Sequence, residues 1–343
     1  MKTAWLTERW QQLREAAEDW LGGKNTFKWV LAGFLCSTVL VCVLGMMWSS
    51  EPENIPVYDG GDQPRVVGII TTNMLIAVSE TLLDKPGGFI SNDIAPPGLF
   101  MDNMPAWEYG VLIQVRELSR SMRESFSRSQ SQSTEDVALA KSEPRFNFSN
   151  NSWAVPASES EYRDGIKYLK RYRDRLANAD DPQAQFYARA DNLRYWLSSV
   201  ESRLGSLSQR LSASIGQRRL NTDLANDVAA QQSTNAPSDQ MIKTPWLKID
   251  DVFYEARGSC WALVHFLRAI EKDFSGVLDN KNARVSVQQI IRELEQTQEP
   301  MFSPIILNGS GFGLLANHSL VMASHISRAN AALIDLRELL SQG

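Results

Sequence analysis

Three carboxylic acids stand within one short stretch of the sequence, GGFISNDIAPPGLFMDNMPAWEYG, at residues 87–110. They are Asp93, Asp102 and Glu108. Such residues can serve as a general acid and a general base, and glycan hydrolysis needs two carboxyl groups held about 5–10 Å apart. Spacing along a loop does not fix that separation. The three acids are therefore only candidates for catalysis, for example on peptidoglycan.

The same stretch has two further interpretations. Phe100, Trp107 and Tyr109 are aromatic residues of the kind that anchor protein contacts. Asp93 and Asp102 can instead cap turns of a loop whose aromatic residues pack on the bundle. Long ordered loops in compact domains often carry function. We favour a structural or partner-binding loop over a catalytic one, with these three aromatic residues as the partner-binding candidates.

A second cluster of charges lies in WLKIDDVFYEARGSCWAL. Asp251 and Glu255 are four residues apart, so they share one face of a helix. We expect ion pairs between helices, in a network that includes Arg257 and more distant partners such as Arg116 or Arg328. Networks of this kind perturb pKa values without being catalytic.

The sequence predicts no cofactor and no metal site. His318 and His325 are seven residues apart, about 10 Å along a helix, which is too far for the two alone to hold one metal ion. The glycines between Gly309 and Gly313 lack the lysine and the βαβ context of a phosphate-binding loop. No G-x-S-x-G nucleophile motif is present.

The strongest positional signal is an uncharged run of 20 residues, Trp29 to Trp48. As a helix it would be about 30 Å long, which matches the hydrocarbon core of a bilayer. Lys24 and Lys28 precede it, whereas acidic residues follow it from Glu51 onward. The positive-inside rule then places the N-terminus in the cytoplasm and residues 51–343 outside. We predict a single-pass anchor over 24–50 that contacts lipid through Trp29–Trp48.

The cysteine positions and the net charge indicate the compartment of the outer domain and exclude one class of partner. Cys36 and Cys42 lie inside the apolar run, which leaves Cys260 alone in the outer domain, so a disulfide within that domain is excluded. A domain large enough to fold without such a crosslink fits a bacterial periplasm. The net charge of −5 provides no basic footprint for nucleic acid.

The segments on either side of the anchor differ. Residues 1–23 have apolar residues at helical spacing, including Trp10 and Leu13, and predict a cytoplasmic amphipathic helix that lies on the membrane or docks a partner. Residues 51–65 read as an extended tether. Residues 66–343 predict one all-α periplasmic domain, with mobile polar loops at about 127–157 and 217–245.

The clearest periodicity runs from Phe186 to Leu211 in strict 4-3 alternation, a heptad seam of more than three heptads. We predict that residues 159–216 form a long coiled-coil-like αα-hairpin, its second helix capped by Asp181. The seam either is exposed for self-association or partner binding, or is covered internally by helices at 249–274 and 315–341. Internal cover is slightly favoured.

The anchor, the 87–110 loop, TPWLKIDDVFYEARG and NGSGFGLLANHSL together resemble an uncharacterised proteobacterial family of membrane-anchored proteins. The resemblance covers nearly the whole chain and implies a Gram-negative inner-membrane protein. It implies no activity and no catalytic residues.

From these observations we expect a scaffold or adaptor in a cell-envelope complex rather than an enzyme. It would bind partner proteins through helical surfaces and the 87–110 loop. The alternative is an enzyme or binding module that acts on peptidoglycan or lipid through the loop carboxylates.

Overall fold

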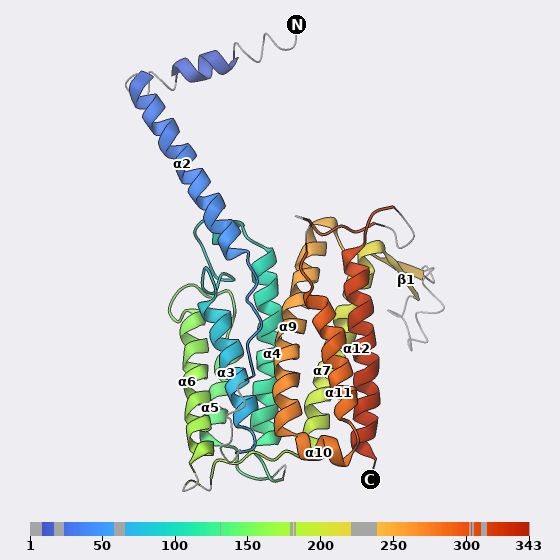
Figure 1. The fold of residues 1–343 in the computed structure, drawn as a ribbon. Coiled ribbons are helices and arrows are strands. Elements are labelled where there is room, and N and C mark those ends of the chain that lie inside the picture. The colour runs from blue at the N-terminus through green and yellow to red at the C-terminus, as the bar shows by residue number, and fades with distance from the viewer. Residues whose placement is uncertain are drawn as a thin grey trace, which may run out of the picture.

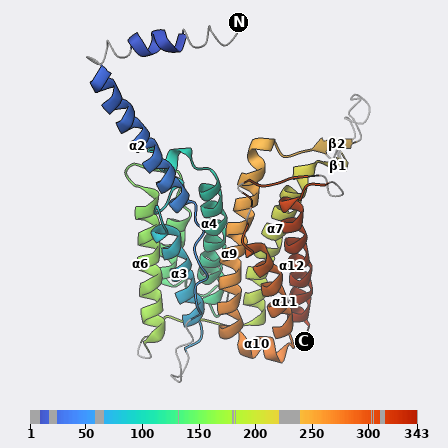
Figure 2. The same ribbon diagram turned by 45° about the horizontal axis from the view of Figure 1, so that its top comes forward.

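The computed structural model describes residues 9–16, 24–57, 66–130, 132–178, 181, 183–220, 239–301, 303, 305–309 and 314–342. Its helices run up and down along one axis, and one further helix, α2 (Lys24–Trp48), projects from one end of the bundle (Figures 1 and 2). Within α2, Thr26–Trp48 is long and apolar enough to cross a membrane. The prediction of an all-α bundle behind one apolar N-terminal helix is confirmed.

The bundle is an array of two halves that meet along α4 and α9. The first half contains α3 (Ile69–Asp84), a 3₁₀ turn (Gly98–Phe100), α4 (Asn103–Ser121), a π-helical turn (Met122–Phe126), α5 (Val137–Phe146) and α6 (Ser158–Ala177). The second contains α7 (Ala190–Ser212), α9 (Ile249–Asp273), α10 (Ser275–Asn280), α11 (Arg284–Glu295) and α12 (His318–Ser341). Short 3₁₀ turns cover Ala213–Ile215, Trp246–Lys248 and Gln296–Gln298.

Two glycines allow α4 and α9 to approach closely enough to join the halves. A Cβ atom at Gly110 would lie 2.0 Å from the carbonyl oxygen of Glu255, and one at Gly258 would lie 2.1 Å from that of Trp107. No larger residue fits without moving a helix backbone. Beside this crossing the Gln114 side-chain amide donates to the Ser259 hydroxyl at 2.7 Å, so the buried polar groups of the contact are partly paired.

The heptad seam is covered from within the bundle, as the sequence slightly favoured. Its leucines and valine from Leu193 to Leu211 are buried, because α7 packs along α12 and also contacts α9. The predicted αα-hairpin is wrong in its pairing. Helix α6 packs on α5 and α3, on the other side of the molecule from α7 (Figure 1).

The α6–α7 connection explains that error. Helix α7 begins at Ala190 rather than near Asp181. Phe186 instead packs between Phe126 and Phe274, with ring centroids 5.3 and 5.7 Å away, and the Tyr187 amide donates to the Phe126 carbonyl. These aromatic contacts hold the segment extended across the end of the bundle.

Parts of the two predicted polar loops form regular structure, and residues 221–238 of the second loop lie outside the described residues. Residues 127–157 contain α5, which is capped at its N-terminus by the Asp136 carboxylate. Residues 217–245 contain the antiparallel strands β1 (Gln217–Leu220) and β2 (Asp239–Ile242), with Gln217 opposite Ile242. Of the expected N-terminal helix, residues 9–16 are helical. The rest of 1–23 and residues 58–65 of the tether lie outside the described residues.

The start of the predicted tether is docked on the bundle. A Cβ atom at Gly87 would lie 2.7 Å from the ring of Trp48, the last residue of α2. Ile55 and Val57 pack against the core. The backbone amide of Ile55 donates to Nε2 of His265 at 2.8 Å. Helix α2 is therefore fixed to the bundle by the residues that follow it, rather than joined through a free linker at this point.

Candidate functional site

Glu108, one of the three loop acids, is a structural clamp. Its side chain and that of Lys85 are both fully buried, and Lys85 Nζ lies 2.5 Å from Glu108 Oε1. The carboxylate also accepts hydrogen bonds from the amides of Ile90 and Ser91 and from the Ser91 hydroxyl. Burial raises the pKa of Glu108, while Lys85 and these donors oppose the rise. All its acceptor positions hold the loop on α4, so no oxygen is open to a substrate.

The other two loop acids lie in different surroundings. Asp93 is half-buried; burial raises its pKa, the nearby Glu159 carboxylate adds to the rise, and Lys85 opposes it. Asp102 is exposed at the N-terminus of α4, where it accepts from the Asn103 amide. Glu108 is fully engaged in the clamp, and none of the three acids lines the apolar cleft described below.

The aromatic candidates separate into one core residue and two surface residues. Trp107 is fully buried, with its ring centroid 5.2 Å from that of Trp261 on α9. Its assignment as a partner-binding residue is wrong, because the close α4–α9 approach encloses it. Phe100 is 75% exposed and Tyr109 is 37% exposed. These two remain available for contacts.

The predicted charge network is divided into separate pairs. Glu255 makes a bidentate pair with Arg210 of α7, with N–O distances of 2.5 and 2.7 Å. Asp251 pairs with Lys248 at 2.7 Å. Arg328 pairs with Glu293 at 2.9 Å.

Arg116 forms no part of an ion-pair network with these acids. It donates instead to the carbonyls of Phe146 and Phe148. The expected partnership of Asp251 and Glu255 with Arg116 or Arg328 is therefore wrong. The spacing of the charges in the sequence is compatible with both the expected and the observed ion pairs, because the neighbouring helix determines which guanidinium group is within reach.

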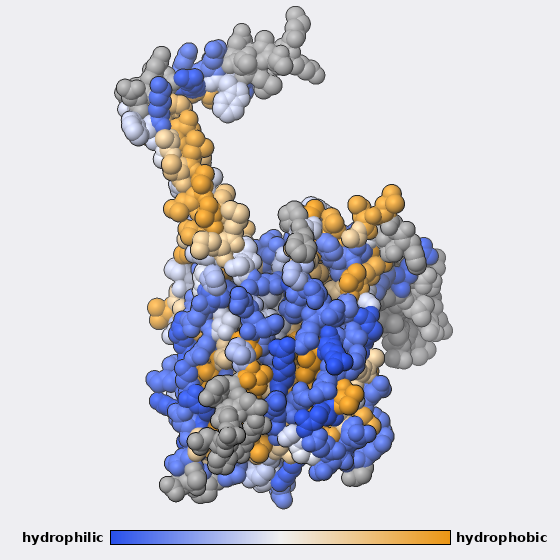
Figure 3. Space-filling model, in the orientation of Figure 1, coloured by the Kyte–Doolittle hydropathy of each residue, from blue (hydrophilic) through white to orange (hydrophobic). Residues whose placement is uncertain are grey.

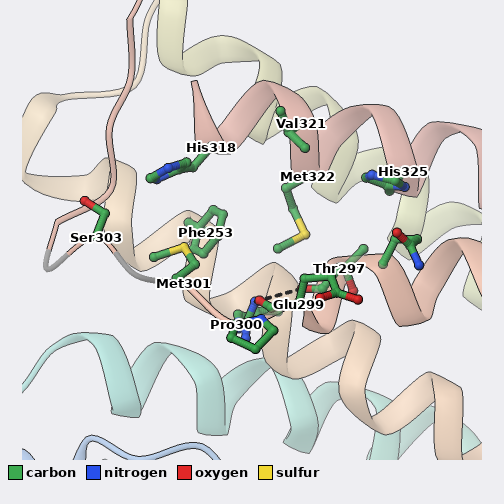
Figure 4. A pocket seen from close by; sticks show the side chains of 12 residues that line it. Phe253, Thr297, Glu299, Pro300, Met301, Ser303, His318, Val321, Met322 and His325 are labelled. Atoms are coloured by element: carbon green, nitrogen blue, oxygen red, sulfur yellow. Dashed lines mark hydrogen bonds between the residues drawn. The ribbon is translucent and has the colours of Figure 1, made fainter. Parts of the chain in front are cut away.

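An apolar cleft lies between α9, the turn after α11 and the first turns of α12 (Figure 4). Its volume is about 360 Å³. In the close-up, Met301 and Met322 approach from opposite walls, while His318 and His325 stand at the two ends of the α12 side. Most of its exposed surface is apolar, and five of its twelve lining residues have apolar side chains: Phe253, Pro300, Met301, Val321 and Met322.

Arg257 joins one wall of this cleft to the segment that follows α2. Its Nε lies 2.6 and 2.8 Å from the two carboxylate oxygens of Glu51. The rest of the guanidinium donates to the carbonyls of Thr297, Gln298 and Glu299, which form the cleft wall. One buried cation thus fixes the segment that follows α2 and the cleft together.

The sequence did not predict this cleft. Its lining comes from three regions that are far apart in the chain, and each contributes only one or two apolar residues that are ordinary in a helix or turn. The Pro300–Met301 pair after α11 is the one local signal, because a methionine in a turn lies outside any helical core stripe.

The comparisons with known proteins identify the family of this chain. Residues 23–343 match the family described as "uncharacterized protein conserved in bacteria" (DUF2333). The chain belongs to this family. The predicted resemblance to an uncharacterised bacterial family is confirmed. The same comparisons find no match among curated proteins or solved structures.

The DUF2333 match begins one residue before α2 and runs to the end of the chain, so it covers the apolar helix, the docked segment and the cleft. Among the residues that the structure describes, no group of three or more His, Cys, Asp or Glu side chains is placed to hold a metal ion.

Two of the histidines of this DUF2333 chain have structural partners. His265 is fully buried; its Nε2 accepts from Ile55, so Nδ1 carries the proton and donates to the Trp261 carbonyl at 2.7 Å. Burial lowers the pKa of His265 to about 4. Nδ1 of His318 accepts from the Leu307 amide at 3.1 Å.

Proposed function

We propose that this protein is a scaffold or adaptor of a bacterial cell-envelope complex, anchored in the inner membrane by α2, with its bundle in the periplasm. The cleft between α9 and α12 would hold an apolar segment of a partner protein. One observation carries the proposal: the charged candidates are engaged in structural pairs, whereas most of the exposed surface of the open cleft is apolar.

The cleft lining supports a peptide segment as its occupant. Methionine side chains are flexible and polarisable, so they adapt to apolar partners of different shape. Met301 and Met322 face each other across the cleft, and the histidines at its edges offer polar contacts to a peptide backbone. A concave apolar surface with a few polar groups at its rim is typical of binding sites.

The proposed topology rests on charge and length. Lys24 and Lys28 lie at the beginning of the apolar helix and Glu51 and Glu53 follow its end, which favours a cytoplasmic N-terminus. The bundle would then lie outside the cytoplasm. Trp29 and Trp48 mark the two ends of the span, where aromatic residues are enriched.

The test is photocrosslinking in living cells from a photoreactive residue at Val321, which lines the cleft and is 59% exposed. The matched control is Ile334, 48% exposed on the same helix but outside the cleft. We expect a discrete adduct between Val321 and one envelope protein, identified by mass spectrometry, and none from Ile334. A lipid or glycan adduct at Val321, or equal labelling from both positions, would reject the adaptor proposal.

A further inference from the structure

Large exposed apolar side chains are concentrated at the end of the bundle from which α2 projects. The loops at this end precede α4, α9 and α12, as both ribbon views show (Figures 1 and 2). Among the described residues outside α2, these loops expose Ile94, Leu99, Phe100, Trp246, Leu247, Ile305, Leu314 and Leu315, each by more than half. Such a concentration on one face indicates an interaction surface.

The loop before α4 lies at the depth of the membrane span. Gly45 is one helical turn before Trp48, inside the apolar segment of α2. A Cβ atom at Gly45 would lie 3.6 Å from Cβ of Pro97. A bilayer that ends at Trp48 therefore reaches the loop around Pro97, and the neighbouring Leu99 and Phe100, 55% and 75% exposed, meet its interface.

The second half of the bundle presents matching residues at the same end. Trp246 and Leu247, in the turn before α9, are 80% and 73% exposed, and Leu314 and Leu315 precede α12. The space-filling view shows apolar surface on both sides of this end, near the base of α2 and above the second half (Figure 3). The opposite end, where α5 and α11 begin, exposes two valines, Val137 and Val285, by more than half.

We propose that this end of the bundle is seated in the interfacial layer of the same bilayer that α2 crosses, as a second, monotopic membrane contact. The occupant of the surface is lipid. Tryptophan, phenylalanine and leucine are the residues that partition to this layer. Lys243, exposed just before the Trp246–Leu247 turn, suits anionic headgroups. The docked residues 51–57 hold the bundle at this height.

This inference rests on the anchor of the proposed function but not on the adaptor role. The test uses nitroxide labels on the full chain, reconstituted in vesicles of phosphatidylethanolamine and phosphatidylglycerol. Single cysteines replace Phe100, Leu247, Leu314 and, as the control, Val285, in a background that carries Cys36→Ala and Cys42→Ala. Native Cys42, retained in a separate Cys36→Ala protein, reports on α2. Cys260 can stay, because it is fully buried and burial raises its thiol pKa to about 12.

Collision of each label with oxygen, which concentrates in lipid, is compared with collision with a water-soluble nickel chelate. We expect oxygen to dominate at Cys42 and at positions 100, 247 and 314, and the nickel chelate to dominate at 285. Nickel dominance at 100, 247 and 314 with oxygen dominance at Cys42 would overturn the seating and leave the anchor intact. Protection from both reagents would assign the surface to a protein and also overturn it. Nickel dominance at Cys42 would overturn the anchor and the seating together.

Discussion

Arg257 and Glu51, separated by 206 residues in the sequence, are joined by a guanidinium–carboxylate contact of 2.6 Å. Glu51 follows α2, and Arg257 also holds the turn that forms a wall of the cleft. The pair therefore sets the position of the bundle relative to α2. It also links the cleft to the segment that follows α2.

Glu51→Gln is expected to destabilise the folded chain by about 1–3 kcal/mol, because it leaves the buried guanidinium of Arg257 without its counter-charge. The measurement is the free energy of unfolding in urea, followed by circular dichroism on the full chain in detergent. Glu53→Gln is the matched control, since Glu53 is exposed two residues away. Equal unfolding free energies for the two variants would contradict the assigned role of the pair.

Glu108→Ala is expected to cost about 3–5 kcal/mol, since the fully buried Lys85 would lose its ion-pair partner. The double variant Lys85→Met, Glu108→Leu should recover part of this loss but not the hydrogen bonds to Ile90 and Ser91. Asp102→Asn, at an exposed cap where asparagine serves equally well, should change stability by less than about 0.5 kcal/mol. A double-mutant cycle by urea unfolding measures the coupling, and additive effects would show that the clamp is absent.

Gly258→Ala is expected to destabilise the bundle by about 1–3 kcal/mol or more, because the new Cβ atom would lie 2.1 Å from the Trp107 carbonyl oxygen and would push α4 from α9. Gly276→Ala in α10 is the control. Its Cβ atom meets nothing within 4 Å, so the better helix propensity of alanine should leave stability unchanged or raise it by up to about 1 kcal/mol. Thermal unfolding midpoints that move equally for both would refute the close-packing explanation.

Acid should weaken the bundle through His265. Its folded-state pKa is lowered to about 4, whereas the unfolded chain has a pKa near 6.5. Below pH 6.5 His265 becomes protonated in the unfolded chain but stays neutral in the folded chain. Its contribution to the free energy of unfolding is therefore fully present above pH 6.5 and decreases as the pH falls toward 4. The loss approaches about 3 kcal/mol.

The measurement for His265 is the unfolding free energy against pH, for the natural chain and for His265→Gln. Glutamine can still accept the Ile55 amide but does not titrate, so the difference between the two curves isolates the histidine. That difference should change between pH 6.5 and pH 4 and level off at lower pH. A constant difference across this range would show that His265 is not buried neutral.

The helices could be predicted from local periodicity, but the helix against which each one packs could not. The stripe of α7 from Leu193 to Leu211 reads directly from the sequence, because a buried helix face repeats every three or four residues. The stripe predicts that another helix packs on it but not which helix. The sequence was therefore equally compatible with packing of α6 on α7. Phe186 continued the stripe in the sequence, yet aromatic contacts with Phe126 hold it in extended chain instead.

The candidate site was predictable in composition but not in arrangement. Trp107 and Phe100 look alike as aromatic residues in a loop, and only the α4–α9 contact separates the buried one from the exposed one. Glu108 was found as an acid of interest, but its partner Lys85 lies in a different element. The cleft assembles from α9, the turn after α11 and α12, so no single window of sequence contains it.

The most direct test of the adaptor proposal compares two glutamates placed on α12 in living cells. Val321→Glu puts a charge in the apolar cleft at an exposed position, and Ile334→Glu puts one outside the cleft on a similarly exposed position. The measurement is the yield of the envelope protein that is crosslinked to the full chain by a short amine-reactive reagent. We predict loss of that protein with Val321→Glu and full retention with Ile334→Glu, at equal expression. Retention with both variants would contradict the cleft as the binding site of the adaptor.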